Sequence, residues 1–139
     1  MEQEESRIGP FVVREELEAG LATQLFSVVY RPEHALMDMG LDGATGAMNT
    51  GSNALLKIQK EEFKTDENFQ RAVDYESQLL ALLDHPRILR SFAKGIHEDR
   101  KWIALEHVEG ISLQRLRDYL FAEGQRLSPE LVIHFILLN

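Results

Sequence analysis

Residues 53–59 read Asn-Ala-Leu-Leu-Lys-Ile-Gln, an apolar run with one lysine towards its end. A run of this length and composition predicts a β-strand, in which successive side chains point to opposite faces. Leu56 and its alternate neighbours are expected to face a core, whereas Leu55 and Lys57 share the other face. A lysine on such an apolar face needs either water or an anion beside it.

A helix is predicted to follow this strand. Thr65-Asp66-Glu67 supplies a capping side chain and then acids in the first turn, where the helix dipole favours them. Asp84-His85-Pro86 ends the helix, because proline cannot continue it. One face of the helix is apolar at helical spacing, through Phe69, Val73, Leu80 and Leu83.

Glu76 falls inside this apolar stripe, because it follows Val73 by three residues and precedes Leu80 by four. A carboxylate on a buried face costs several kcal/mol unless it is paired. Lys57 is the obvious partner, since it lies on the preceding strand of a sheet that this helix could cover. Each residue alone would more often face solvent, but together they predict an ion pair that holds something anionic.

The remaining elements favour an α+β fold. Three strands, a helix, two strands and then further helices give the expected order. The other strands are expected at residues 11–13, 25–30, 88–96 and 101–107, and the later helices begin near Leu113 and at Ser128-Pro129-Glu130. Residues 15–23 are expected to connect the first two strands, with Gly20 at the bend.

Two segments show no regular pattern. Residues 1–9 are polar and are expected to be loose, and residues 32–52 form a long loop or insertion punctuated by glycines. Methionines at positions 37, 39 and 48 leave two interpretations of that loop open, a plain connector or a methionine-rich docking patch.

The bulk composition excludes several classes. A chain of 139 residues fits one compact domain, and its net charge of −8 disfavours nucleic acid as a partner. It has no cysteine, no signal-peptide pattern and no apolar stretch that could span a bilayer, so a cytoplasmic protein without membrane contact is expected. The five histidines lack ligand spacing, and no metal site is expected.

The ordered motifs resemble the protein kinase catalytic domain, serine/threonine type. Residues 54–57 are similar to its valine-alanine-isoleucine-lysine strand motif, and Glu76 with the His85-Pro86 exit is similar to its αC helix. Residues 105–113 resemble the hinge, and residues 128–132 resemble the start of the long C-lobe helix. The resemblance implies a kinase-like N-lobe, a five-stranded antiparallel sheet with one αC-type helix, followed by the first helices of a truncated C-lobe.

This resemblance divides the chain into a flexible N-terminus at 1–10, an N-lobe at 11–107 that includes the 32–52 loop, and a hinge with the start of the C-lobe at 108–139. It implies that Lys57, oriented by Glu76, holds the α- and β-phosphates of ATP. Gly20 would belong to its phosphate loop, and the adenine and ribose contacts that it implies come from Leu17, Leu25, Leu55, Leu105, Glu106, Val108 and Ser112.

The individual roles also follow from the resemblance. Leu105 would be the gatekeeper behind the adenine pocket, and Leu55 its ceiling in place of the usual alanine. The carbonyl of Glu106 and the amide of Val108 would bind the adenine edge. Leu17 and Leu25 would cover the ring, while Ser112 stands where a ribose contact is common.

The sequence departs from the kinase pattern in two places. The glycine loop retains only Gly20, because Glu18 and Thr23 replace the other two glycines, and weak nucleotide affinity is therefore expected. The His-Arg-Asp catalytic loop and the Asp-Phe-Gly magnesium motif do not occur in these residues. The segment by itself is not expected to transfer phosphate, and Mg²⁺ would be held mainly in a complete parent domain.

Three functions remain open. The first is the N-terminal part of a kinase that phosphorylates protein serine and threonine with Mg-ATP. The second is a non-catalytic kinase-like interaction or regulatory module, and the third is a small-molecule phosphotransferase of similar fold. In the first two, the apolar face of the last helix, residues 131–138, needs the rest of the C-lobe or a partner protein to cover it.

Overall fold

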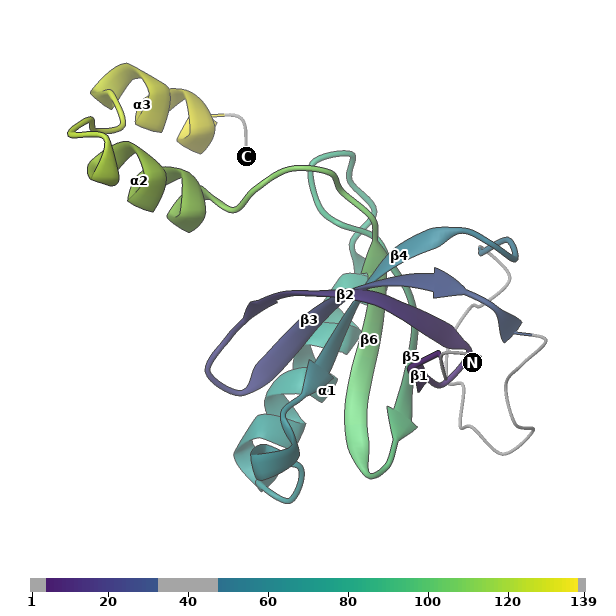
Figure 1. Cartoon of the computed structure of the whole chain (residues 1–139). Helices are drawn as coiled ribbons and strands as arrows, with labels where there is room; N and C mark the ends of the chain where they lie inside the picture. Colours follow the sequence, from purple (N-terminus) through teal and green to yellow (C-terminus); the bar gives the residue numbers. More distant parts are fainter. Residues whose placement is uncertain (1–4, 33–47, 138–139) are drawn as a thin grey trace. The chain divides into compact units, whose positions relative to one another are not determined.

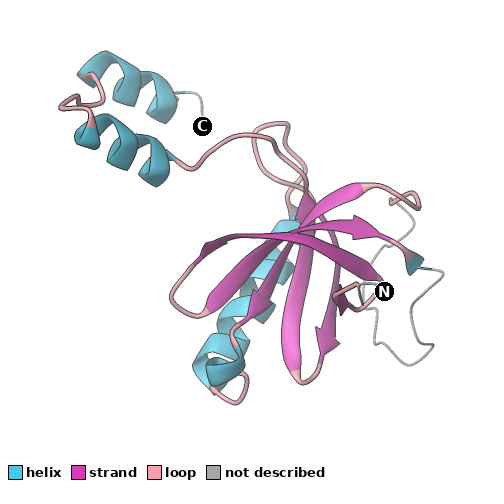
Figure 2. Ribbon diagram, in the orientation of Figure 1, coloured by secondary structure: helices cyan, strands magenta, loops and turns pink. Residues whose placement is uncertain are grey.

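The computed structural model describes residues 5–32 and 48–137, which form a curled antiparallel sheet with one covering helix and a separate pair of helices (Figures 1 and 2). The sheet has six strands in the order β1-β2-β3-β4-β6-β5. The strands are β1 (Arg7–Ile8), β2 (Phe11–Ala19), β3 (Thr23–Tyr30), β4 (Asn53–Gln59), β5 (Ser91–His97) and β6 (Arg100–Glu106). The helices are the short 3₁₀ turn η3 (Glu61–Phe63), α1 (Glu67–Leu82), α2 (Leu113–Ala122) and α3 (Pro129–Leu137).

The chain divides into two compact units, Met1–His107 and Val108–Asn139. The first unit holds the sheet and α1, and the second holds α2 and α3. This is the α+β arrangement expected from the sequence. None of the helices in the described part of the chain combines the length and the apolar character needed to cross a lipid bilayer.

β4 lies inside the sheet, between β3 and β6, and separates two apolar layers. On one face Ala54, Leu56 and Ile58 join a buried cluster with Phe11 and Trp102, as the alternation of side chains predicted. On the other face Leu55 packs with Val73, Ile103 and Leu105 beneath α1. The strand is therefore covered on both sides, which explains its nearly continuous apolar sequence.

The N-terminal segment is more ordered than the sequence indicated. The expectation of a loose N-terminus over residues 1–10 is wrong from residue 7 onwards, because Arg7 and Ile8 pair with Val12 and Phe11 as β1. Ile8 and Phe11 are buried in the cluster that surrounds Trp102. Their hydrophobic burial stabilises this sixth strand, which is too short to show a periodic pattern in the sequence.

The connection between the first two strands is also shorter than expected. Residues 15–19 belong to β2, and the turn to β3 takes only residues 20–22. The Gly20 amide donates to the Thr23 carbonyl oxygen over 2.8 Å, which closes this turn. Of the 32–52 loop, residues 33–47 lie outside the described part of the chain, together with two of its methionines, and Met48 is buried in the Trp102 cluster.

α1 begins and ends where its sequence signals stand. The Asp66 carboxylate accepts hydrogen bonds from the amides of Asn68 and Phe69, as a capping side chain does. The helix ends at Leu82, before the His-Pro pair. Val73 is buried and Leu80 is half-buried against the sheet, but Leu83 follows the helix and is exposed.

The hairpin between β5 and β6 turns at Glu98 and Asp99, both of which have positive φ angles of 48° and 64°. Two central residues in this conformation are typical of the tight turn that matches the twist of adjacent strands. The second unit is a helix hairpin in which Ser112 and Ser128 accept amide hydrogen bonds at the starts of α2 and α3. Both helix starts were predicted from the sequence.

Gly95 on β5 lies against the indole ring of Trp102, its cross-strand partner. A Cβ atom there would stand 2.4 Å from Cζ2 of Trp102, and Trp102 is packed against Phe11 and cannot move freely. We expect Gly95→Ala to lower the free energy of unfolding by about 2 kcal/mol, measured by urea denaturation. Ile96→Thr, on the exposed neighbour, should change it by less than about 0.5 kcal/mol. Equal stabilities for the two variants would contradict this packing.

Candidate functional site

The predicted ion pair between strand and helix is present. Nζ of Lys57 on β4 lies 3.0 Å from Oε1 and 2.9 Å from Oε2 of Glu76 on α1, so the ammonium group is shared by both carboxylate oxygens. The two residues are 19 positions apart in the chain. The side chains remain 31 % and 37 % exposed, so the carboxylate is less buried than the apolar stripe suggested. An anion from solvent can therefore reach the ammonium group.

The sheet fixes the position of Lys57 by pairing on both sides. Its cross-strand neighbours are Leu25 on β3 and Ile103 on β6, which share its face. In the next row Leu55 pairs with Ser27 and with Leu105. Lys57 thus lies beside the apolar side chains of Leu25, Leu55 and Ile103.

The helix fixes the position of Glu76 through its buried residues. Val73 and Ser77 are buried on either side of Glu76 along α1, and Leu80 packs against the same cluster one turn further on. The burial of these residues against the sheet turns the Glu76 carboxylate towards β4. The carboxylate and the ammonium group hold each other at the edge of the apolar cluster.

The apolar residues predicted to surround an adenine ring fall into two groups. Leu55 and Leu105 are buried neighbours, and Leu25 is partly buried against the same cluster, so the structure brings these three together with Lys57. Leu17 stands on β2, within the irregular stretch of its pairing with β3. Leu17 is 38 % exposed and is not part of the cluster.

The hairpin that carries Gly20 fits a phosphate group poorly. It is a tight turn between two paired strands, and only one glycine lies at its tip. Glu15, Glu16 and Glu18 are exposed along the adjoining strand. Three carboxylates oppose an anion electrostatically, whereas the kinase glycine loop offers backbone amides instead.

The hinge residues are divided between the two units. Glu106 ends β6, where its amide donates to the Arg90 carbonyl oxygen over 2.8 Å and its carboxylate accepts from the Arg90 amide over 3.3 Å. Val108 and Ser112 belong to the second unit and are described within it alone. There Val108 is exposed, and the Ser112 hydroxyl caps α2.

His85 is a turn residue, as its place beside proline suggested. Its Nδ1 accepts a hydrogen bond from the Arg87 amide, and its carbonyl oxygen accepts one from the Ile88 amide. Within residues 5–32 and 48–137, no group of three or more potential ligands stands close enough together to bind a metal ion.

A second ion pair between the sheet and α1 was not predicted. Nζ of Lys101 on β6 donates to Oδ2 of Asp74 on α1. The available signal was weak, because Asp74 lies outside the apolar stripe and Lys101 stands at the polar end of its strand. Only the register of β6 against β4 places this lysine under the helix.

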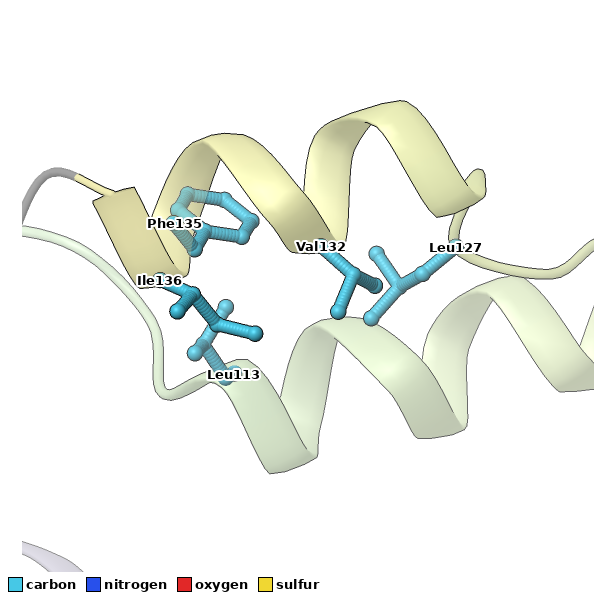
Figure 3. Close-up of a pocket in the computed structure, with 5 residues that line it drawn as sticks. All are labelled: Leu113, Leu127, Val132, Phe135 and Ile136. Carbon is cyan, nitrogen blue, oxygen red and sulfur yellow. The ribbon is translucent and has the colours of Figure 1, made fainter.

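The second unit holds an apolar pocket of about 230 Å³ between α2 and α3, shown in Figure 3. Its lining consists of Leu113, Leu127, Val132, Phe135 and Ile136. None of these side chains offers a charge or a hydrogen-bonding group. The pocket therefore resembles the interior of a helix pair and does not provide for nucleotide chemistry.

The fold and the strand–helix ion pair together define a protein-kinase-like N-lobe with part of a C-lobe. The sequence is similar to serine/threonine-protein kinases: it is 33 % identical over 69 residues to PrkC of Bacillus subtilis and 34 % identical over 56 residues to PknI of Mycobacterium tuberculosis. These alignments cover 50 % and 40 % of this chain, but only 10 % of each relative. No protein-family model matches the chain.

Solved structures show the same fold. The crystal structure of the M. tuberculosis PknI kinase domain superposes with a TM-score of 0.58 at 20 % identity, over 84 % of this chain and 40 % of that one. A mutant form of the same domain gives a TM-score of 0.61, over 86 % of this chain and 41 % of that one. The chain thus has the fold of the N-terminal region of these kinase domains.

The coupling between Lys57 and Glu76 can be measured with a double-mutant cycle of Lys57→Met and Glu76→Gln. We expect a coupling free energy of about 1 kcal/mol in urea denaturation, because both carboxylate oxygens share one partly shielded ammonium group. The pair Arg71–Glu67 on the outer face of α1 is the control. Its cycle is expected to give only about 0.3 kcal/mol, and a Lys57–Glu76 value no larger than this would contradict the assigned geometry.

Proposed function

We propose that this chain is the nucleotide-binding part of a serine/threonine protein kinase domain, and that Lys57 holds the α- and β-phosphates of ATP. The observation that carries the proposal is the contact of Lys57 with both oxygens of Glu76 at the edge of an apolar cluster that includes Leu25, Leu55 and Leu105. A structural ion pair does not require such a surface, but a ligand with an apolar ring and a polyanionic tail does. ATP has both parts.

The residues fit ATP on the sheet side. The ammonium group of Lys57 would bind the phosphates while Glu76 keeps it in place, and Leu25, Leu55 and Leu105 would contact the adenine ring. Leu17 would close the ring from the hairpin side. The Glu106 carbonyl would accept a hydrogen bond from the adenine edge, and the Val108 amide would donate one to it.

The fit is worse on the hairpin side. Glu15, Glu16 and Glu18 are expected to weaken the binding of a polyanion, and Gly20 alone supplies the close backbone approach. Leu55, bulkier than the alanine usual in kinases, is expected to narrow the adenine pocket. We therefore propose weak ATP affinity in this chain, with Ser112 as a ribose contact in a complete domain.

The reaction of a complete parent would be phosphoryl transfer from Mg-ATP to serine or threonine of a protein substrate. Support comes from the names of the similar proteins, PrkC and PknI, both serine/threonine-protein kinases. The residues that would hold Mg²⁺ and act as base in that family are not among these 139. In this chain Lys57 and Glu76 would position the phosphates, and a cytoplasmic site of action accords with the use of ATP.

One observation favours the alternative, a non-catalytic interaction module. α3 has an exposed apolar surface in the second unit, where Ile133, Ile136 and Leu137 are more than half exposed. Such a surface is typical of a protein–protein contact. A chain that binds no ATP at millimolar concentration but forms a stable complex through these residues would support the module over the kinase.

ATP affinity in Lys57→Met tests the kinase proposal. We expect the dissociation constant for ATP, measured by isothermal titration calorimetry, to rise about tenfold, because a charge-assisted contact to phosphate is lost. Lys64→Met is the control, since Lys64 pairs with Glu61 on the surface of the same unit. If both variants bind ATP as the unsubstituted chain does, Lys57 does not hold the phosphates.

Leu55→Ala tests the adenine contact separately. The variant is expected to bind ATP about threefold more tightly, since removal of the side chain enlarges the space for the ring, while its stability falls by about 2 kcal/mol. Calorimetric titrations with ATP and with inorganic triphosphate separate the contact with the adenine ring from the contacts with the phosphates. An equal gain for both ligands would show that Leu55 does not contact the ring.

A further inference from the structure

The contact between α1 and the sheet is narrow for a helix of this length. Of its 16 residues only Val73 and Ser77 are buried; Leu80 is half-buried against the sheet, and Phe69 is half-buried against Phe63 of η3, outside the sheet. Val73, Ser77 and Leu80 are spaced by four and three, so they form a single line along the helix. A helix that rests on one line of side chains can roll about that line, because apolar contacts have no preferred direction.

Two acidic residues border this line. Residues advance by about 100° around an α-helix, so Asp74 and Glu76 lie about 160° apart, with Val73, Ser77 and Leu80 in the sector between them. Each acid pairs with a lysine of the sheet: Glu76 with Lys57 on β4, and Asp74 with Lys101 on β6. The two ion pairs therefore hold the helix from opposite flanks.

Lys101 is tied to the strand that carries Lys57. Its backbone amide donates to Oε1 of Gln59 over 2.9 Å, and Gln59 is completely buried at the end of β4. Lys57 and Gln59 are two positions apart on that strand and point to the same face. The contacts thus form a closed ring, from β4 through Lys57 and Glu76 to α1, and back through Asp74 and Lys101 to Gln59.

We infer that Asp74 and Lys101 are positioning residues that fix the rotation of α1, so that Glu76 faces Lys57. A pair on one flank limits roll in one direction only, and a pair on the opposite flank limits it in the other. Loss of the Asp74–Lys101 contact would release the helix towards one side and loosen the Lys57–Glu76 pair. The consequence for ATP rests on the proposed function, but the effect on the helix does not.

Because the chain has no cysteine, a single thiol introduced on α1 can be labelled selectively, and its labelling rate can be measured. Ser77→Cys introduces a single thiol on the buried line of α1, between the two ion pairs, with little change in side-chain size. Its rate of reaction with a disulfide reagent under native conditions reports how often this face of the helix becomes accessible. Global stability is measured in parallel by urea denaturation.

In the Ser77→Cys background, Asp74→Asn is expected to raise the labelling rate about threefold, as loss of a partly exposed ion pair predicts. Glu67→Gln removes the ion pair with Arg71 on the outer face of the same helix and is expected to leave the rate unchanged. The reversed pair, Asp74→Lys with Lys101→Asp, is expected to restore the original rate. Lys101→Arg should preserve it, because arginine can also reach Asp74.

Two results would overturn the inference. One is a labelling rate that Asp74→Asn leaves unchanged. The other is an increase no larger than the change in global unfolding accounts for, because the pair would then stabilise the unit without fixing the helix. Calorimetric titration with ATP separates this inference from the proposed function: if the unsubstituted chain binds no ATP but the labelling rates behave as expected, the positioning role stands and the kinase proposal fails.

Discussion

The ammonium group of Lys57 lies beside the apolar side chains of Leu25, Leu55 and Ile103, and the position of α1 on the sheet depends on the need to neutralise it. A charge in such surroundings is tolerated only with a counter-charge within reach. Glu76 supplies it, but only if α1 lies across β4 with one particular face turned inward. The burial of Val73 and Ser77 holds that face against the sheet, and Asp66 caps the start of the helix. A second ion pair, between Asp74 and Lys101, joins α1 to β6.

The same surface combines features that favour a nucleotide with features that oppose it. Lys57 and the leucines of the sheet provide a cation beside an apolar wall, whereas the β2–β3 hairpin presents carboxylates and a tight turn. Electrostatic attraction by Lys57 and repulsion by the carboxylates would then act in opposite directions on a bound nucleotide. The balance between them decides whether the chain acts as a weak nucleotide binder or as a kinase-like module with another role.

The sequence was most informative at charged residues that lie within apolar patterns. Lys57 in an apolar strand and Glu76 in an apolar stripe each required a partner of opposite charge, and proline, serine and aspartate signals located the helix ends. β1 was missed because two residues carry no periodicity, and their place depends on burial against Trp102. Asp74 and Lys101 were missed because each is an ordinary surface residue until strand register brings them together.

The contact between the two ends of the first unit also has a consequence for biosynthesis. The Gly9 amide donates to Nδ1 of His97, which is 88 positions downstream, and Ile8 and Phe11 belong to the cluster of Trp102, which lies further on. At roughly 5–20 residues per second, a ribosome needs about 4–18 s to synthesise that interval. Ile8 and Phe11 would remain without Trp102 as a partner throughout this delay, so their apolar side chains stay exposed until that part of the chain has been made.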